Sequence, residues 1–176
     1  QSATSCSANC DAQAGCGESD SNALCVGGSL GDGAAGLEVV LGKPLPAGLP
    51  MAAQDYLHRR FWRPLPQLAL GQLLRGVASA GLDISDGLLA DAGHIASASG
   101  VRLLINGPQL PMSDALRSWS ERQQLDWMLR GGDDYVLLFT LPRAARSQLE
   151  RWRAAGHAVC VIGEVQGGQG VQLDLG

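Results

Sequence analysis

Short apolar runs alternate with stretches of helical periodicity along most of this chain. Apolar runs typical of buried strands lie at Ala23–Val26, Gly81–Ile84, Val101–Ile105, Tyr135–Leu141, Ala158–Val165 and Val171–Leu175, and we expect the last two to pair. Helical spacing predicts helices at Ala34–Leu41, Ala52–Phe61, Leu68–Ala78, Gly87–Ser99, Arg122–Leu129 and Arg143–Ala155. Because helices and strands interleave, the pattern favours an α+β or α/β domain with a mixed β-sheet covered by helices.

The first 22 residues have a different texture, rich in Ser, Ala, Gly and Cys and without hydrophobic periodicity. We expect residues 1–22 to be a disordered or foreign leader and residues 23–176 to form one domain. Cys6, Cys10, Cys16 and Cys25 match neither the spacing of zinc knuckles nor a disulfide framework. The first three of these cysteines are therefore expected to lie outside the core.

Composition and charge exclude several classes of function. The chain has 176 residues and a formal net charge of −4, and its 13 basic residues are scattered, which argues against a nucleic-acid partner. No apolar run approaches the roughly 20 residues that span a bilayer, and the N-terminus lacks the layout of a signal peptide. A cytoplasmic enzyme with small-molecule substrates, bound to neither nucleic acid nor membrane, is the expectation.

The densest chemical signal is the segment Asp83–Asp86, where a strand ends in two carboxylates and a helix follows. Two acids this close repel each other unless a cation joins them, and a hard ion such as Mg²⁺ turns the pair into a binding site. Ser85 and the free amides of the helix that begins near Gly87 would favour a phosphate at the same point. The alternative is that Ser85 or Asp86 only caps this helix, with Gly87 easing the turn.

A second motif indicates a different class of protein. Gly31–Gly36 reads GxGxxG after a strand and before a helix, which is typical of dinucleotide-binding Rossmann folds. Such a fold needs a second parallel strand after the helix, ending in an acid about 20 residues on. Here the helix leads into the Pro/Gly-rich segment Gly42–Pro50 and a further helix.

The run DISDGLLADAGHIASASGV, from Asp83 to Val101, resembles the signature segment of thiamine-monophosphate kinases. Further resemblances follow in the family's order: Gly28–Leu37 to TGxxGDSAAGL, Arg63–Pro66 to RPxPR, Leu110–Ser113 to LPLS, Arg130–Tyr135 to SGGEDYEL and Val161–Val165 to IGxV. The sequence departs from the family pattern at Gln67 for Arg, at Asp133 for Glu and at Val136 for Glu. No single short motif would be as specific as this ordered set.

The resemblance implies a fold like the C-terminal domain of aminoimidazole ribonucleotide synthetase, a member of the same superfamily. It also implies transfer of the ATP γ-phosphate to thiamine monophosphate by a homodimeric enzyme that uses Mg²⁺. Carried over residue by residue, the family's roles give Asp83 and Asp86 as Mg²⁺ ligands, Ser85 as a contact to ATP and Asp133 as a contact to the substrate. No side chain of this chain is assigned a catalytic role.

The resemblance covers only the C-terminal half of such a kinase, since residues 1–22 match nothing in the family's N-terminal half. We therefore expect an incomplete active site and little activity from this chain alone. A non-catalytic fragment that binds nothing tightly is a further reading. Among neighbouring residues, Asp91, His94 and Asp114 are expected at helix surfaces, and Asp134 is expected to orient the GGDDY turn.

Overall fold

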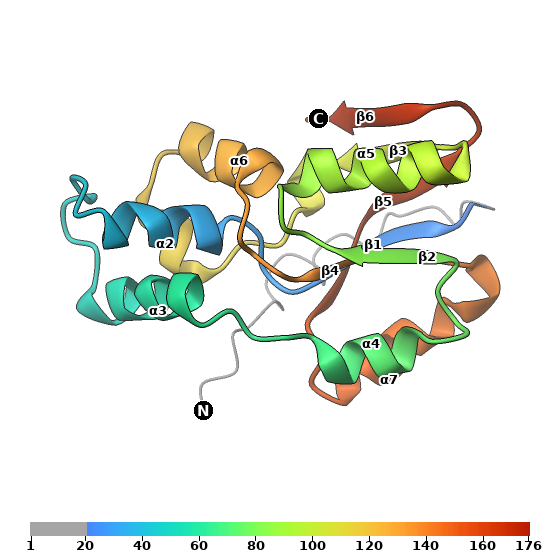
Figure 1. Cartoon of the computed structure of the whole chain (residues 1–176), viewed down its shortest axis with the longest axis horizontal. Helices are drawn as coiled ribbons and strands as arrows, with labels where there is room; N and C mark the ends of the chain where they lie inside the picture. Colours follow the sequence, from blue (N-terminus) through green and yellow to red (C-terminus); the bar gives the residue numbers. More distant parts are fainter. Residues whose placement is uncertain (1–20) are drawn as a thin grey trace.

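A computed structural model describes residues 21–176. Figure 1 shows a mixed sheet with α5 and α6 over one face and α4 and α7 over the other, while α2 and α3 lie side by side beyond one end of the sheet. The α+β fold with a helix-covered mixed sheet is confirmed. No helix among the described residues is long and apolar enough to cross a membrane.

Six strands of the described region form one sheet in the order β2–β4–β1–β5–β3–β6. Neighbours are antiparallel except β3 and β6, which are parallel. Their bounds are Ala23–Gly27 for β1, Ala80–Asp83 for β2, Arg102–Asn106 for β3, Leu137–Leu141 for β4, Val159–Gln166 for β5 and Gly170–Asp174 for β6.

The α-helices of the described region are α2 (Asp32–Val40), α3 (Met51–Trp62), α4 (Leu68–Leu74), α5 (Leu88–Ser99), α6 (Glu121–Arg130) and α7 (Ser147–Ala154). Three short 3₁₀ turns, η1 (Gly107–Gln109), η2 (Asp114–Ser118) and η3 (Arg143–Ala145), join other elements. Two helices are shorter than expected, because the chain turns at Gly76 with a positive φ after α4 and a 3₁₀ turn takes the start of the predicted last helix.

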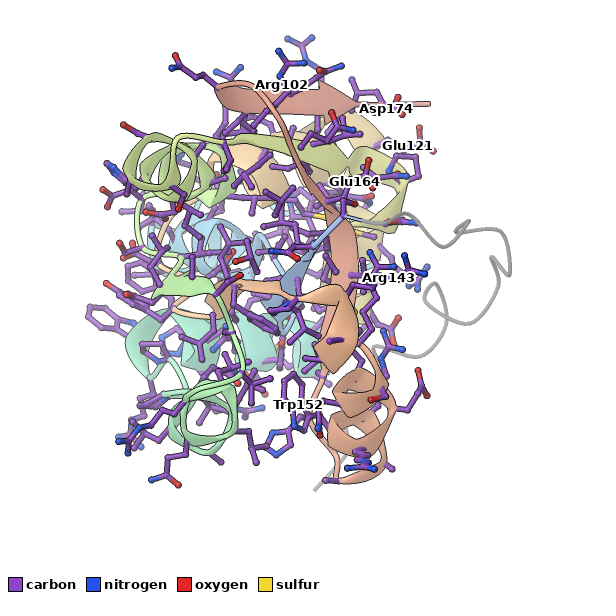
Figure 2. The ribbon with its side chains drawn as sticks, turned by 90° about the vertical axis from the view of Figure 1, so that its right-hand side faces the viewer. Arg102, Glu121, Arg143, Trp152, Glu164 and Asp174 are labelled. Carbon is purple, nitrogen blue, oxygen red and sulfur yellow. The ribbon has the colours of Figure 1, made fainter. Side chains whose placement is uncertain are left out.

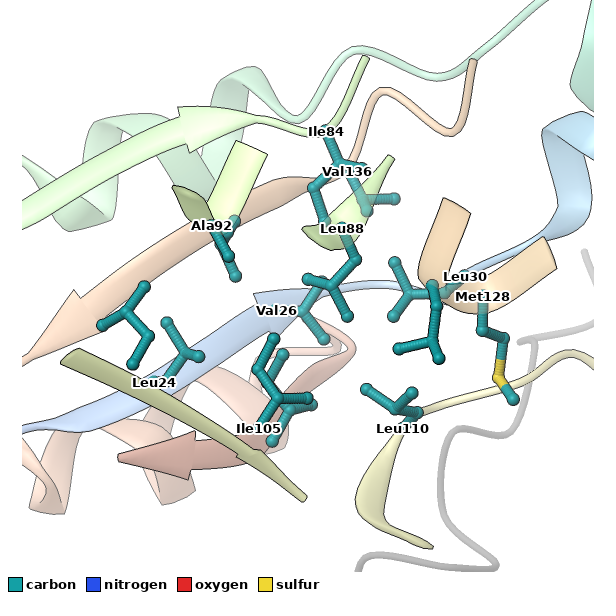
Figure 3. Close-up of a cluster of buried hydrophobic side chains, with 14 of the residues drawn as sticks. Leu24, Val26, Leu30, Ile84, Leu88, Ala92, Ile105, Leu110, Met128 and Val136 are labelled. Carbon is teal, nitrogen blue, oxygen red and sulfur yellow. The ribbon is translucent and has the colours of Figure 1, made fainter. Parts of the chain in front are cut away.

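Each face of the sheet carries its own hydrophobic core. In Figure 3, Leu24 and Val26 of β1 meet Leu88 and Ala92 of α5, and this is the larger cluster. On the other face, Trp152 of α7 packs edge-to-face on Phe139 with ring centroids 6.3 Å apart. Figure 2 shows Trp152 low in the view, with Arg102 and Asp174 of the outermost strand pair near the top.

The expected pairing of the last two strands is wrong. β6 pairs with β3 in parallel, from Arg102 opposite Gly170 to Asn106 opposite Asp174, and β3 in turn pairs with β5. The alternating exposure of β6 shows that one of its faces packs, and α5 covers that face. A period of two fixes the buried face of a strand, whereas the choice of neighbour depends on contacts far along the chain.

The dinucleotide-binding reading is also wrong. Both neighbours of β1 run antiparallel to it, and α2 leads directly to α3 rather than to a second strand. Gly36 has a packing role instead, since a Cβ there would lie 2.5 Å from the carbonyl oxygen of Leu57 on α3. The glycine therefore allows two helices to approach closely.

The expected leader overlaps the described domain by two residues. The Ser21 hydroxyl donates to Glu164 Oε2 at 2.7 Å, and the Asn22 carbonyl accepts from the Val165 N–H at 2.9 Å. The rest of the leader, including Cys6, Cys10 and Cys16, lies outside the described residues. Cys25 and Cys160 are both buried, and burial raises the pKa of Cys25 to about 12.

Candidate functional site

The sheet brings the segments with the densest motifs to one of its ends. Leu137, the first residue of β4, is opposite Gly27 at the end of β1 and opposite Asp83 at the end of β2. The glycine-rich turn after β1, the acidic loop after β2 and the GGDDY loop before β4 consequently meet there. Sequence segments more than 100 residues apart form one site.

The GGDDY loop and the acidic loop are joined by backbone hydrogen bonds. Asp133 N–H donates to the Ser85 carbonyl at 3.0 Å, and Tyr135 N–H donates to the Ile84 carbonyl at 2.8 Å. This contact is close, since a Cβ on Gly132 would lie 2.5 Å from the Ser85 carbonyl oxygen. It explains why β4 begins at Leu137 rather than at Tyr135 as predicted.

Asp133 and Tyr135 have positive φ angles of 65° and 51°, which non-glycine residues seldom adopt. Such backbone costs about 1 to 3 kcal/mol per residue and persists only where the surroundings enforce it. The hydrogen bonds to Ile84 and Ser85 are the enforcing contacts here. The resulting loop presents the Asp133 carboxylate to the Tyr135 hydroxyl, which donates to Asp133 Oδ1 at 3.0 Å.

Asp134 links the GGDDY loop to the glycine-rich turn. Its buried carboxylate accepts the Gly31 N–H at 2.6 Å and the Gly33 N–H at 2.9 Å. Burial raises the pKa of Asp134 to about 7, while the two glycine amides and the Arg60 charge favour the ionised form. Asp134 thus orients the turn after β1, a wider role than the one predicted within its own loop.

The prediction that Asp91 lies at a helix surface is wrong, because its side chain is buried and only 4% exposed. Its Oδ2 accepts the backbone N–H groups of Ser85 and Asp86, each at 3.0 Å. The carboxylate therefore holds the loop that precedes its own helix. The alternative interpretation, in which Ser85 or Asp86 only caps α5, is not supported, since the N-cap residue is Gly87 and no side chain caps it.

A further buried acid, Asp32 in the glycine-rich turn, was not singled out from the sequence. It accepts hydrogen bonds from Ser29 and Ser113 at 2.5 Å each and from the Tyr56 hydroxyl at 2.7 Å. Burial, followed by the charge of Asp32, raises the pKa of Tyr56. Ser113 belongs to the segment resembling LPLS, so that motif serves here to hold the turn.

Asp83 and Asp86 are both exposed, as expected for side chains outside the core, and Ser85 between them is half-buried. The hydrogen bond to Asp133, then the negative charges of Asp133, Asp83 and Asp86, raise the pKa of the Tyr135 hydroxyl. The acidic loop and the GGDDY loop therefore bring the three predicted acids to the same end of the sheet. This region of negative charge favours a bound cation.

Among the described residues, Asp86, Asp91 and His94 can also approach one ion together. Each offers one ligand atom, and these atoms lie within 4.8 Å of one another. His94 is exposed on α5, as predicted for a surface histidine. Carboxylate oxygens suit Mg²⁺, and exposed acids of this kind also occur without an ion.

A groove opens beside the acidic loop, with a volume of about 550 Å³. Asp83, Tyr135 and Leu137 form its wall at the end of the sheet. The opposite wall comes from the segment that resembles RPxPR and from α4, and it consists of Pro64, Pro66, Gln67, Leu68, Gly71, Gln72 and Arg75. Asp83 thus points to a groove rather than to the core.

A family model described as "AIR synthase related protein, C-terminal domain" matches residues 20–176. The chain belongs to this family. The match covers the described domain, including all the loops of the site. Val136, where the resembled kinases carry Glu, is 2% exposed and packs in the larger hydrophobic cluster of this chain, directly before β4.

Curated relatives and solved structures confirm the resemblance to thiamine-monophosphate kinases. The thiamine-monophosphate kinase of Escherichia coli K12 is 44% identical over 133 residues, which are 75% of this chain and 40% of the relative. The crystal structure of the kinase from Stenotrophomonas maltophilia K279a has a TM-score of 0.80 at 38% identity, covering 89% of this chain and 51% of that one. AaThiL complexed with AMPPCP and TMP gives a TM-score of 0.74 at 35% identity, covering 90% and 50%. The chain thus spans about half the length of the relatives that it matches.

Proposed function

We propose that this chain supplies part of the active site of a kinase that transfers the γ-phosphate of ATP to thiamine monophosphate. In this reaction the bond from the γ-phosphorus to the bridging oxygen of ADP breaks, and a bond forms to an oxygen of the substrate phosphate. The observation that carries the proposal is that the acidic loop Asp83–Asp86 and the GGDDY loop meet at one end of the sheet, where Asp133 N–H donates to the Ser85 carbonyl at 3.0 Å. The relative AaThiL, complexed with AMPPCP and TMP, supports the choice of nucleotide and substrate.

Mg²⁺ fits the residues present, because Asp83 and Asp86 are exposed carboxylates in a region of negative charge. We assign both residues as its ligands. When bound, the ion would neutralise charge on the phosphates during transfer. Asp83 and Asp86 keep this position through the backbone contacts of their loop, since Asp91 holds the amides of Ser85 and Asp86.

Ser85 contacts ATP in this proposal, and Asp133 contacts thiamine monophosphate. The first turn of α5 has no capping side chain, so its free N–H groups can face a phosphate near Ser85. Asp133 is held by its hydrogen bond to Ser85, which couples the substrate contact to the nucleotide contact. The homodimer implied by the resemblance and the cytoplasmic location expected from the composition stay predictions.

The test joins this chain to the remaining N-terminal part of the Escherichia coli relative and measures thiamine diphosphate formation. We expect turnover from the joined protein and far less than about 1 per second, the lower range for kinases, from this chain alone. Asp86→Asn should lower turnover by about 100-fold or more, as loss of a charged metal ligand does. The matched control is Asp126→Asn, which changes an exposed acid on α6. A folded joined protein that is equally active with Asp86→Asn would overturn the proposal.

A further inference from the structure

Asp32 of α2 and Asp134 of the GGDDY loop are two fully buried carboxylates next to the site. Each is 0% exposed, although aspartates are almost never fully buried unless they are paired. Three hydroxyl groups donate to Asp32, and two glycine amides donate to Asp134. These neutral donors satisfy the oxygens without removing either charge, and neighbouring like charges in a buried region repel. A cation that reaches both acids therefore stabilises the pair.

Arg60 of α3 is a cation that reaches both acids. Its side chain is 11% exposed, and its Nε lies 4.0 Å from Oδ2 of Asp32. Its Nη2 donates to the backbone carbonyl of Asp134 at 2.9 Å. Burial raises the pKa of Asp134 most strongly and the Asp32 charge raises it further, whereas the Arg60 charge lowers it. A single guanidinium thus bridges α2 and the GGDDY loop, as its planar set of donors allows.

The turn after β1 depends on the ionised form of Asp134. The Gly31 N–H donates to Oδ2 and the Gly33 N–H to Oδ1, so both carboxylate oxygens act as acceptors. A protonated carboxyl carries a hydrogen on one oxygen, and between these two N–H donors that hydrogen finds no acceptor. Protonation therefore breaks one of the two hydrogen bonds that join the glycine-rich turn to the GGDDY loop. The Arg60 charge, which favours the ionised carboxylate, stabilises both.

The same guanidinium fixes the backbone beside the proposed substrate contact. Asp134 lies between Asp133 and Tyr135, whose φ angles are 65° and 51°. The amides of these two residues are tied to the acidic loop, while the Asp134 carbonyl between them is tied to α3 through Arg60. Three consecutive residues are thereby held from two sides, as a backbone with positive φ requires in order to persist.

We propose that Arg60 is a positioning residue, which holds the glycine-rich turn and the GGDDY loop in one arrangement through its contacts with Asp32 and Asp134. Arg60 touches no ligand in this role, because its guanidinium is largely buried and faces the two acids. The group whose place it fixes is Asp133, and the contact of Asp133 with thiamine monophosphate rests on the proposed function. Arg60 acts on the site from 74 positions away in the sequence.

The amide signals of Gly31 and Gly33 in nuclear magnetic resonance spectra of this chain report the charge on Asp134, because both amides donate to it. The charged groups that act on Asp134 are Asp32 of α2 and Arg60 of α3, and its loop meets the acidic loop through backbone hydrogen bonds. In the wild-type chain we expect both signals to move with a common midpoint at about pH 7, the pKa to which burial raises Asp134. Two signals that do not titrate together would overturn the proposal.

Arg60→Gln removes the cation and should raise this midpoint by about one pH unit or more, since an opposite charge nearby lowers carboxyl pKa values by about 1 to 3. Arg60→Lys keeps the charge without the planar fork, so its midpoint should stay within about 0.5 of the wild-type value. The matched control is Arg59→Gln, which changes an exposed arginine of the same helix and should leave the midpoint unchanged. A merely structural role would lower the melting temperature of Arg60→Gln without moving the midpoint, and that result would overturn the proposal.

Arg60→Lys keeps the test decisive if Arg60→Gln does not fold. This variant lacks the Nη2 donor to the Asp134 carbonyl, so the amide signal of the neighbouring Asp133 should differ from that of the wild-type chain. The signals of Leu24 and Ile105 in the core should stay in place and show that the fold is kept. An Asp133 amide signal identical to that of the wild-type chain would overturn the positioning role.

Kinetics of the protein joined to the N-terminal part of the relative separate this inference from the proposed function. At a pH above both midpoints, Arg60→Gln should raise the KM for thiamine monophosphate by about tenfold and change kcat by less than about threefold, because a displaced Asp133 weakens substrate binding more than transfer. A raised midpoint with an unchanged KM in an active joined protein would overturn the link from Arg60 to Asp133. A raised midpoint in a joined protein that is inactive would support the positioning role and count against the kinase proposal alone.

Discussion

The Oδ2 atom of Asp91 accepts the backbone N–H of Ser85 at 3.0 Å, although Asp91 lies six residues later and within the next helix. The same oxygen accepts the Asp86 N–H. A residue on a rigid element thus fixes the shape of the acidic loop. This arrangement makes the loop sensitive to a change that leaves both proposed metal ligands in place.

Replacing Asp91 should affect stability according to whether an acceptor remains. Asp91→Ala leaves two N–H groups of a partly buried loop without an acceptor, and we expect a loss of about 2 to 3 kcal/mol in the free energy of unfolding. Asp91→Asn keeps one oxygen for both amides and should cost less than about 1 kcal/mol. Urea denaturation of both variants measures the difference, and equal losses would show that the hydrogen bonds do not hold the loop.

Asp83→Asn and Asp86→Asn should separate metal binding from helix capping. Each removes one of several neighbouring like charges, so without metal neither variant should melt below the wild-type chain. With Mg²⁺ present, we expect a smaller rise in melting temperature for both variants than for wild type. Thermal melts with and without Mg²⁺ measure this, with Asp126→Asn as the control. A capping role would give the reverse, a loss of about 0.5 to 2 kcal/mol and unchanged response to the ion.

Asp134 should make stability depend on pH. Burial raises its pKa from 3.8 to about 7 in the folded chain, so the native state holds a proton that the unfolded state has released. The free energy of unfolding should therefore fall as pH rises from about 4 to about 7, and this contribution should be flat above that window. Urea titrations across the window should show a smaller slope for Asp134→Asn, while Asp114→Asn, an exposed acid, should keep the wild-type slope. An unchanged slope in Asp134→Asn would contradict the assignment.

Gly33 should be intolerant of a side chain. A Cβ there would lie 2.6 Å from the Gly132 carbonyl oxygen and 2.7 Å from that of Asp133, so Gly33→Ala forces the two loops apart. We expect a loss of about 1 to 3 kcal/mol in the free energy of unfolding and weaker Mg·ATP binding. Gly93→Ala is the matched control inside α5, where a Cβ meets nothing within 4 Å and a gain of up to about 1 kcal/mol is expected. Equal stability of the two variants would show that the loops are not closely packed.

The fold class and most elements could be predicted because their signals are local. Apolar runs such as Leu137–Leu141 and the period of Leu88–Ser99 are contained within a few residues. The partner of β6 could not be predicted, because alternation in Gly170–Asp174 gives a buried face and no neighbour. The start of β4 was misplaced because two positive φ angles at Asp133 and Tyr135 follow from contacts with the acidic loop.

The candidate site shows the same limit. Asp83 and Asp86 stand out because two acids follow a strand directly, and their exposure agrees with that expectation. Asp32 was missed and Asp91 was placed at a helix surface, because the structural role of each depends on the groups that it hydrogen-bonds. Asp32 is held by Ser113 from 81 positions away, and Asp91 turns into its own preceding loop. Neither relationship has a periodicity that a sequence would reveal.

The central position of β1 has a consequence for the synthesis of the protein. Ala23 pairs with Leu141 on one side and Glu164 on the other, so both partner strands leave the ribosome long after β1 does. All five residues of β1 are buried in the finished sheet, and a growing chain must therefore carry this apolar segment uncovered until β4 and β5 emerge. Such distant pairing gives slow folding and exposes the nascent chain to aggregation. A chaperone that shields Ala23–Gly27 during translation would act on the segment that stays without a partner longest.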